Sequence, residues 1–202
     1  MPVGSIRVAY RRDVRESASR RDTEGFGRDN EQVGLVFELV VNFGRNHDKV
    51  GAATEAVRRL HTLHVRGVEV PLGDPYVSRF PGPRGYIEFS VWPRGIGYGP
   101  SKIPNLDPAS LTELELTGIG HDLYSLLRQF DGYRAAIVGW DPEEIVDLHE
   151  LETEWIKSGD VASLDGLVLA TDLKNRWQLD ERFVPFAEGY CWLPYGGSKN
   201  LR

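Results

Sequence analysis

The amino-acid sequence predicts an α+β fold, in which a mixed or antiparallel sheet carries helices mainly on one face. Three observations predict it. Segments with strand periodicity alternate with segments of helical periodicity along the chain. The strand segments keep polar residues on one face, which a parallel sheet buried on both sides would not tolerate. The middle of the chain has the order β-α-β-α-β, which is close to a ferredoxin-like arrangement. Because no Pro/Ser/Gly linker divides the chain, residues 1–202 are interpreted as a single domain.

The N-terminal part of the chain falls into two segments. Ile6, Val8 and Tyr10 alternate with polar residues, which predicts an edge strand. Residues 11–32 contain almost no apolar side chains and mix both charge signs, so we expect a flexible arm or loop there. An arginine-lined binding arm is the alternative interpretation.

A strand and then a helix are predicted next. In residues 33–43 (VGLVFELVVNF) one face is wholly apolar, whereas the other face includes Glu38 and Asn42. Residues 46–67 have the 3–4 spacing of an amphipathic helix. Asn46 or Asp48 would cap its start, and Gly67 would take the left-handed conformation just beyond its end.

The centre of the chain predicts a loop, a strand and a second helix. Prolines break residues 68–85, which are interpreted as mostly loop. Residues 86–92 (YIEFSVW) alternate like a strand, and a turn-rich loop follows over 93–108. Ser110 and Glu113 predict a capping box at the start of the second helix. Its apolar stripe ends at Gly132 and consists of Leu116, Ile119, Leu123, Leu126, Leu127 and Phe130.

Shorter elements are predicted toward the C-terminus. Residues 133–140 (YRAAIVGW) indicate a third strand. Asp141 as cap and Pro142 in the first turn predict a helix that ends before Gly159. A short apolar strand within residues 164–173 and a brief helix over 173–177 would lead into the final segment.

No complete catalytic motif is present, so we predict no catalytic residue, no cofactor and no metal site. The glycines of GIGYGPSK (residues 95–102) do not match the spacing of a phosphate loop. His61 and His64 lie three residues apart on the first predicted helix, and we interpret them as solvated rather than as metal ligands. Cys191 has no local histidine or basic neighbour, which is typical of a small buried residue rather than a nucleophile. The sequence therefore favours a non-catalytic role.

The segment FVPFAEGYCWLPYGG, residues 183–197, concentrates aromatic side chains near the end of the chain. As a strand it would place Tyr190 and Trp192 on one face and Cys191 on the other. Two interpretations remain open, a terminal core strand and a recognition surface. The second would make Tyr190, Trp192 and Tyr195 the binding residues, since interfaces favour such side chains.

Together with the preceding GLVLATDL, this segment resembles the C-terminal part of small bacterial α+β proteins of the toxin-immunity kind. The resemblance covers only about the last 35 residues and supplies no individual functional residue. It implies a cytoplasmic, acidic, non-catalytic inhibitor that binds a cognate toxin.

Composition supports the same kind of function. The net charge of −6 disfavours a nucleic-acid partner, and no apolar run is long enough to span a membrane. One cysteine and an excess of arginine over lysine indicate the cytoplasm of a bacterium with a GC-rich genome. We therefore expect a protein-binding module whose partner is another protein. The alternative is a small enzyme or ligand-binding protein with a pocket under the Pro/Gly-rich loops of residues 71–105.

Overall fold

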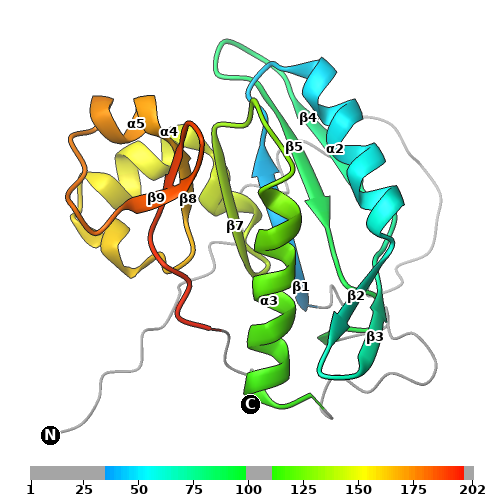
Figure 1. The fold of residues 1–202 in the computed structure, drawn as a ribbon. Coiled ribbons are helices and arrows are strands. Elements are labelled where there is room, and N and C mark those ends of the chain that lie inside the picture. Colours follow the sequence, from blue (N-terminus) through cyan, green and yellow to red (C-terminus); the bar gives the residue numbers. More distant parts are fainter. Residues whose placement is uncertain (1–34, 99–110, 198–202) are drawn as a thin grey trace, which may run out of the picture. The chain divides into compact units, whose positions relative to one another are not determined.

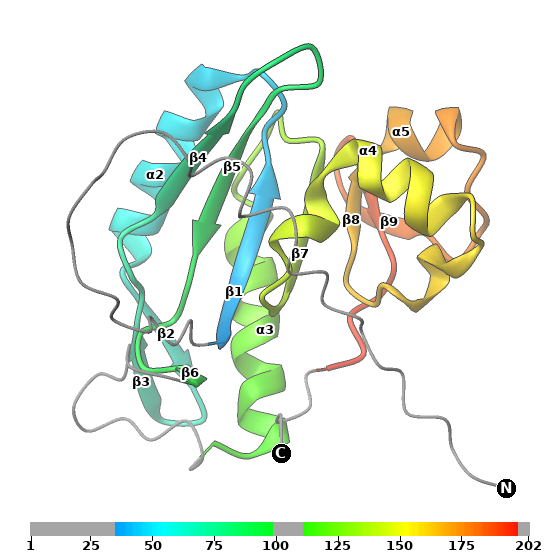
Figure 2. The same cartoon turned by 180° about the vertical axis from the view of Figure 1, so that it is seen from behind.

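A computed structural model describes residues 35–98 and 111–197 of the chain (Figure 1; Figure 2). Three predictions lie outside these residues: the edge strand near the N-terminus, the arm over residues 11–32, and most of the loop over 93–108. Ser110, half of the predicted capping box, lies outside them as well.

One antiparallel sheet organises the described residues. Its strand order is β4-β5-β1-β7-β8-β10-β9, and each neighbouring pair is antiparallel. The strands are β4 (Tyr76–Phe80), β5 (Tyr86–Val91), β1 (Leu35–Asn42), β7 (Ala135–Trp140), β8 (Val168–Ala170), β10 (Tyr190–Trp192) and β9 (Val184–Ala187). The short β6 (Gly97–Tyr98) pairs with the start of β1. This architecture confirms the predicted α+β fold.

The ferredoxin-like middle follows from the order of the elements. Helix α2 (His47–Leu60) follows β1, and helix α3 (Glu113–Leu127) precedes β7. The spatial order β4-β5-β1-β7 is that of a split β-α-β arrangement, with β1 between β5 and β7. Both helices cover the same face of the sheet (Figure 1). Their layer encloses the larger core, which includes the whole apolar stripe predicted for α3.

The first helix is shorter than predicted. It ends at Leu60, where His61 takes the left-handed conformation with φ of 42°. The chain then forms a separate hairpin from β2 (Thr62–Val65) and β3 (Val68–Pro71). Gly67 is left-handed, as predicted, but it lies in the hairpin turn after Arg66. Positive φ at both turn positions is the geometry that two-residue hairpins require.

Two further expectations about local structure are wrong. Residues 68–85 were expected to be mostly loop, but they contain β3 and β4, with prolines at the strand ends. The capping box of α3 lies two residues later than predicted. The Thr112 hydroxyl accepts the Glu115 N–H at 3.2 Å, and the Glu115 carboxylate accepts the Thr112 N–H at 2.8 Å.

Short helices cover the opposite face of the sheet near β7, β8 and β10 (Figure 2). They are η2 (Glu143–Val146), α4 (Leu148–Glu150), η3 (Leu151–Ile156, with π geometry), η4 (Asp160–Ser163) and α5 (Thr171–Arg176). The single helix predicted after Asp141 is therefore wrong. Asp141 does not cap a helix: it has φ of 44°, and its carboxylate accepts the Val36 N–H at 2.7 Å. Asp147 caps α4 instead, by accepting the N–H groups of the two residues that follow Leu148.

Candidate functional site

The aromatic C-terminal segment forms the β9–β10 hairpin and packs against the sheet and α3. Phe186 is buried, and Arg128 of α3 lies over its ring at 4.1 Å while donating to the Phe186 carbonyl. Tyr190 is half-buried and stacks on Tyr133, with ring centroids 4.0 Å apart. The Tyr190 hydroxyl accepts the Tyr133 backbone N–H at 3.2 Å. The segment is thus part of the core.

Trp192 and Tyr195 meet at Tyr124 of α3. The ring of Tyr124 lies 5.3 Å from Trp192 and 5.1 Å from Tyr195, and its hydroxyl donates to the Gly166 carbonyl at 2.8 Å. Tyr195 is buried, whereas Trp192 is half-buried. The three residues predicted for binding therefore lie along the side of the sheet that α3 covers. Their role in binding stays a prediction. Much of their surface already packs against other residues of this chain, which leaves less of it for a partner.

The other residues singled out in the sequence do not gather into a site. His61 ends α2, whereas His64 lies on β2, with its Nε2 3.5 Å from the Glu69 carboxylate. The sequence analysis placed both histidines on the first helix, and this prediction is wrong, because the helix ends before His61. Cys191 is buried, its thiol donates to the Leu169 carbonyl at 3.6 Å, and burial raises the pKa of that thiol.

A group of carboxylates on the face opposite α2 and α3 escaped the sequence analysis. Oxygen atoms of Glu38, Asp141 and Glu143 all lie within 4.8 Å of one another. The β1–β7 pairing brings them together, because Glu38 lies opposite Gly139 and Asp141 follows β7 directly. In the sequence, the signals were a glutamate within an apolar strand and the acidic run DPEE after the strand of residues 133–140, which was assigned to a helix start.

Burial determines the chemistry of this group. Glu38 is only 5% exposed. Desolvation, and next the negative charge of Glu143, raise the pKa of Glu38 to about 8, although a hydrogen bond from Ser90 opposes the shift. Such oxygens suit a hard divalent cation. The raised pKa of Glu38 favours its protonated form, and the Asp141 carboxylate accepts the Val36 N–H at 2.7 Å.

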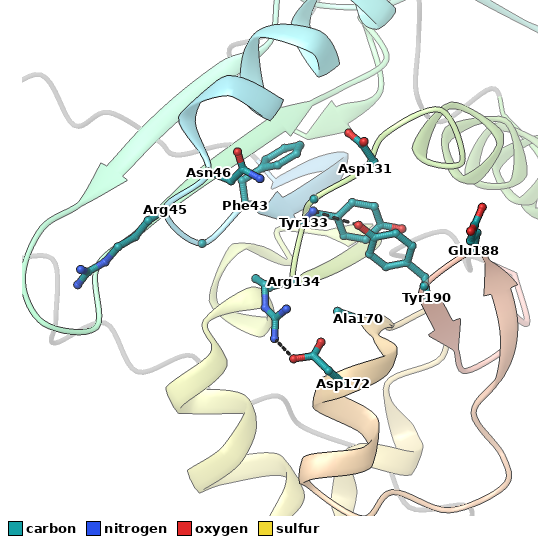
Figure 3. Close-up of a pocket in the computed structure, with 13 residues that line it drawn as sticks. Phe43, Arg45, Asn46, Asp131, Tyr133, Arg134, Ala170, Asp172, Glu188 and Tyr190 are labelled. Carbon is teal, nitrogen blue, oxygen red and sulfur yellow. Dashed lines mark hydrogen bonds and ion pairs between the residues drawn. The ribbon is translucent and has the colours of Figure 1, made fainter.

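Two depressions lie near the ends of the strands. Figure 3 shows the broader one, of about 800 Å³, where Arg134 and Asp172 form an ion pair at 2.7 Å and Tyr190 lies on the wall. The second, of about 330 Å³, is lined by Arg84, Tyr86, His149 and Arg176 among others. Within the described part of the loops over 71–105 that were predicted to cover a pocket, residues 71–98, only residues 84–86 line either depression.

The strongest surface feature lies on strand β4, at the edge of the sheet. Tyr76 is 62% exposed, Phe80 43% and Val77 36%. Among the described residues only Leu114 and Val184 are other large apolar side chains with such exposure. Phe80 stacks on Tyr86 of β5 with ring centroids 4.6 Å apart, which widens the aromatic surface. The edge of β4 is therefore the candidate docking surface among the described residues.

Arginines surround this edge. Arg79 and Arg84 are exposed, and the Arg45 guanidinium donates to the carbonyls of Gly82 and Pro83 at the tip of the β4–β5 hairpin. The only acidic residue between β4 and the end of β5 is the buried Glu88. None of the ion pairs found in the described residues involves these three arginines. The sequence did not reveal this surface, because YVSRF shows no clean alternation of apolar and polar residues and lies between prolines, so it was assigned to a loop.

Comparisons with known proteins add no relative: no protein-family model matches the chain, and neither curated proteins nor solved structures show significant similarity to it. Among the described helices, none has both the length and the apolar character needed to cross a membrane.

Proposed function

We propose that this protein is a non-catalytic binding module for another protein, and that it docks its partner on the edge of β4. The observation that supports the proposal is the exposure of Tyr76, Val77 and Phe80 on one short strand. Apolar side chains left in water at an edge invite association. Aromatic residues also dominate the binding energy of protein interfaces.

Exposure is our reason for preferring β4 to the C-terminal segment as the docking surface. Tyr195 is 8% exposed, against 62% for Tyr76. A side chain that is already buried can add little new apolar area when a partner binds. We therefore assign the first contact to β4, and Tyr190 and Trp192 are secondary candidates.

The narrower proposals have less support. An inhibitor of a cognate toxin is suggested by the resemblance of the C-terminal segment alone. A bacterial and cytoplasmic setting is suggested by the arginine excess and the single cysteine. The alternative of a small enzyme or ligand-binding protein has one observation in its favour, the depression of about 330 Å³ that Arg84 lines together with His149 and Arg176.

The proposal is tested by capture with a matched pair of variants. The Tyr76→Thr/Phe80→Thr variant removes the two exposed rings while keeping strand-forming residues. The control is Val184→Thr, at the exposed position of the opposite edge strand. Proteins crosslinked to the wild-type chain in a lysate of the source organism are quantified by mass spectrometry.

We expect at least one protein to be recovered about tenfold less with the double variant, while Val184→Thr retains it. Val184→Thr should unfold within about 0.5 kcal/mol of the wild type, as surface changes usually do. The double variant also loses the Phe80–Tyr86 stack, which should lower its free energy of unfolding by about 0.5–1.5 kcal/mol while leaving it folded. Equal recovery with the wild type and the double variant would contradict the proposal.

A further inference from the structure

We infer that the partner binds as an extended acidic segment that adds a strand to the free edge of β4. This inference rests on the proposed function and names the chemistry of the partner at the same surface. Three features of the described residues carry it: an open edge, the faces on which the β4 side chains lie, and the charge around the hairpin.

The edge of β4 can accept a strand. β4 pairs with β5 along its whole length, from Tyr76 opposite Ser90 to Phe80 opposite Tyr86. No strand of residues 35–98 or 111–197 pairs with its other side. In an antiparallel pair the peptide groups of alternate residues point away from the partner. β4 therefore presents backbone donors and acceptors outward along the length of the strand.

The opposite edge of the sheet differs from β4. β9 ends the sheet on that side and carries Pro185 in its second position. A proline has no N–H to donate, which is a common protection of sheet edges. β4 has no proline within YVSRF, so each of its residues keeps its backbone N–H, although the strand is short and prolines lie on both sides of it.

The register of β4 determines which side chains an added strand would meet. Val77 and Arg79 lie opposite Phe89 and Ile87, which face the core beneath α2 and α3. Tyr76, Ser78 and Phe80 lie on the other face. An added strand would place every second side chain on the face of Tyr76 and Phe80, beside their exposed rings. Its other side chains would lie on the opposite face, beside Val77 and Arg79. Apolar residues suit the first set, and an acidic residue suits the position next to Arg79.

Charge favours an acidic partner over a second copy of this chain. The chain carries a net charge of −6, yet the exposed charges along the hairpin are those of Arg79 and Arg84, with Arg45 at its tip. Pairing of two β4 strands would bring two such sets of arginines into one interface, where they repel. An acidic segment neutralises them and is steered toward the edge during association.

The inference is tested with peptides selected from a random display library of 12-residue sequences panned on the purified full-length protein. We expect the selected peptides to alternate apolar residues with Asp or Glu and to lack proline at their centres. Each is then synthesised in two N-methylated forms, in which the methyl groups block one or the other alternating set of N–H groups. Binding is measured by fluorescence anisotropy.

Strand addition predicts that one N-methylated form binds about tenfold or more weakly, because those N–H groups donate to β4. The other form, whose methyl groups face solvent, serves as the matched control and should retain its affinity. The Arg79→Ser/Arg84→Ser variant should lose affinity to a similar extent, and the loss should shrink at high salt.

The outcomes separate the inference from the proposed function. Peptides that need Tyr76 and Phe80 but tolerate both N-methylated forms, or that show no acidic enrichment, would overturn strand addition and leave β4 as a docking surface. Selected peptides whose binding is unaffected by the Tyr76→Thr/Phe80→Thr variant would overturn both.

Discussion

At the scale of single residues, the polar face of β1 differs most from expectation. Glu38 and Asn42 lie on the face that the sequence predicted to be half polar and partly open, yet both are buried. Asn42 is satisfied, because its amide donates to the Val146 carbonyl at 2.8 Å and accepts the Gly44 N–H at 2.7 Å. Glu38 differs, because burial and next the charge of Glu143 raise the pKa of its carboxyl to about 8 and outweigh the hydrogen bond from Ser90.

This environment predicts a specific dependence of stability on pH. The pKa of Glu38 rises from 4.5 to about 8 on folding, so between these values the folded chain holds a proton that the unfolded chain releases. The free energy of unfolding should therefore decrease as pH rises through this window and level off above it. Glu38→Gln, which keeps the shape without the charge, should remove this contribution. Urea unfolding at pH 5 and pH 8 measures it.

The variant should match the wild type at pH 5 and be more stable than it at pH 8. Glu181→Gln, at an exposed position, is the control and should leave the wild-type dependence unchanged. The same loss of stability between pH 5 and pH 8 in Glu38→Gln as in the wild type would show that Glu38 does not carry the effect.

At the scale of elements, helix glycines show how packing overrides propensity. Gly51 lies on the exposed side of α2, and a Cβ added there would meet no atom within 4 Å. A Cβ at Gly118 of α3 would lie 2.7 Å from Cγ1 of Val65 in β2. Gly118 lowers the helix propensity of α3, but it lies where the β2–β3 hairpin packs on that helix and leaves no room for a side chain.

Opposite effects are predicted for the two alanine substitutions. Gly51→Ala should raise the free energy of unfolding by about 0.5–1 kcal/mol, the usual gain in a helix interior. Gly118→Ala gains the same propensity but forces Val65 aside, and overpacking of this kind costs about 1–3 kcal/mol. We expect a net loss of stability, measured by urea unfolding. The Gly118→Ala/Val65→Ala variant, which opens space for the new methyl group, should show a smaller penalty than the sum of the single changes.

Long periodic elements could be predicted from the sequence, whereas short and proline-flanked ones could not. β1, β5, β7 and α3 each bury a regular apolar pattern, so periodicity alone located them. β4 has only five residues between prolines, and its pattern is two-sided because an edge strand buries little. The candidate surface was missed for that reason: the exposure that makes β4 available to a partner also removes the apolar signal by which strands are recognised.

At the scale of the whole molecule, two cores share one sheet. Neighbouring residues of the central strands face opposite sides: Val41 joins the core under α2 and α3, whereas Val40 joins the core under the short helices. Val168 and Leu169 divide in the same way on β8. Neither layer can separate from the sheet without exposing apolar residues of the strands that also support the other layer.

This sharing predicts that residues 35–197 unfold in one cooperative transition, as the single-domain interpretation requires. Leu123→Ala in the first core and Leu151→Ala in the second each remove a fully buried side chain and should cost about 2–5 kcal/mol. Each change should lower the urea midpoint seen by far-UV circular dichroism and by tryptophan fluorescence to the same extent. Leu114→Ala, at a 55% exposed position, is the control and should leave the midpoint nearly unchanged.

Hydrogen exchange measured by mass spectrometry is the sharper test, because it follows each layer separately. If Leu151→Ala released the amides of η3 and α5 while those of α3 kept wild-type protection, the two layers would be independent and the chain would not unfold as one unit.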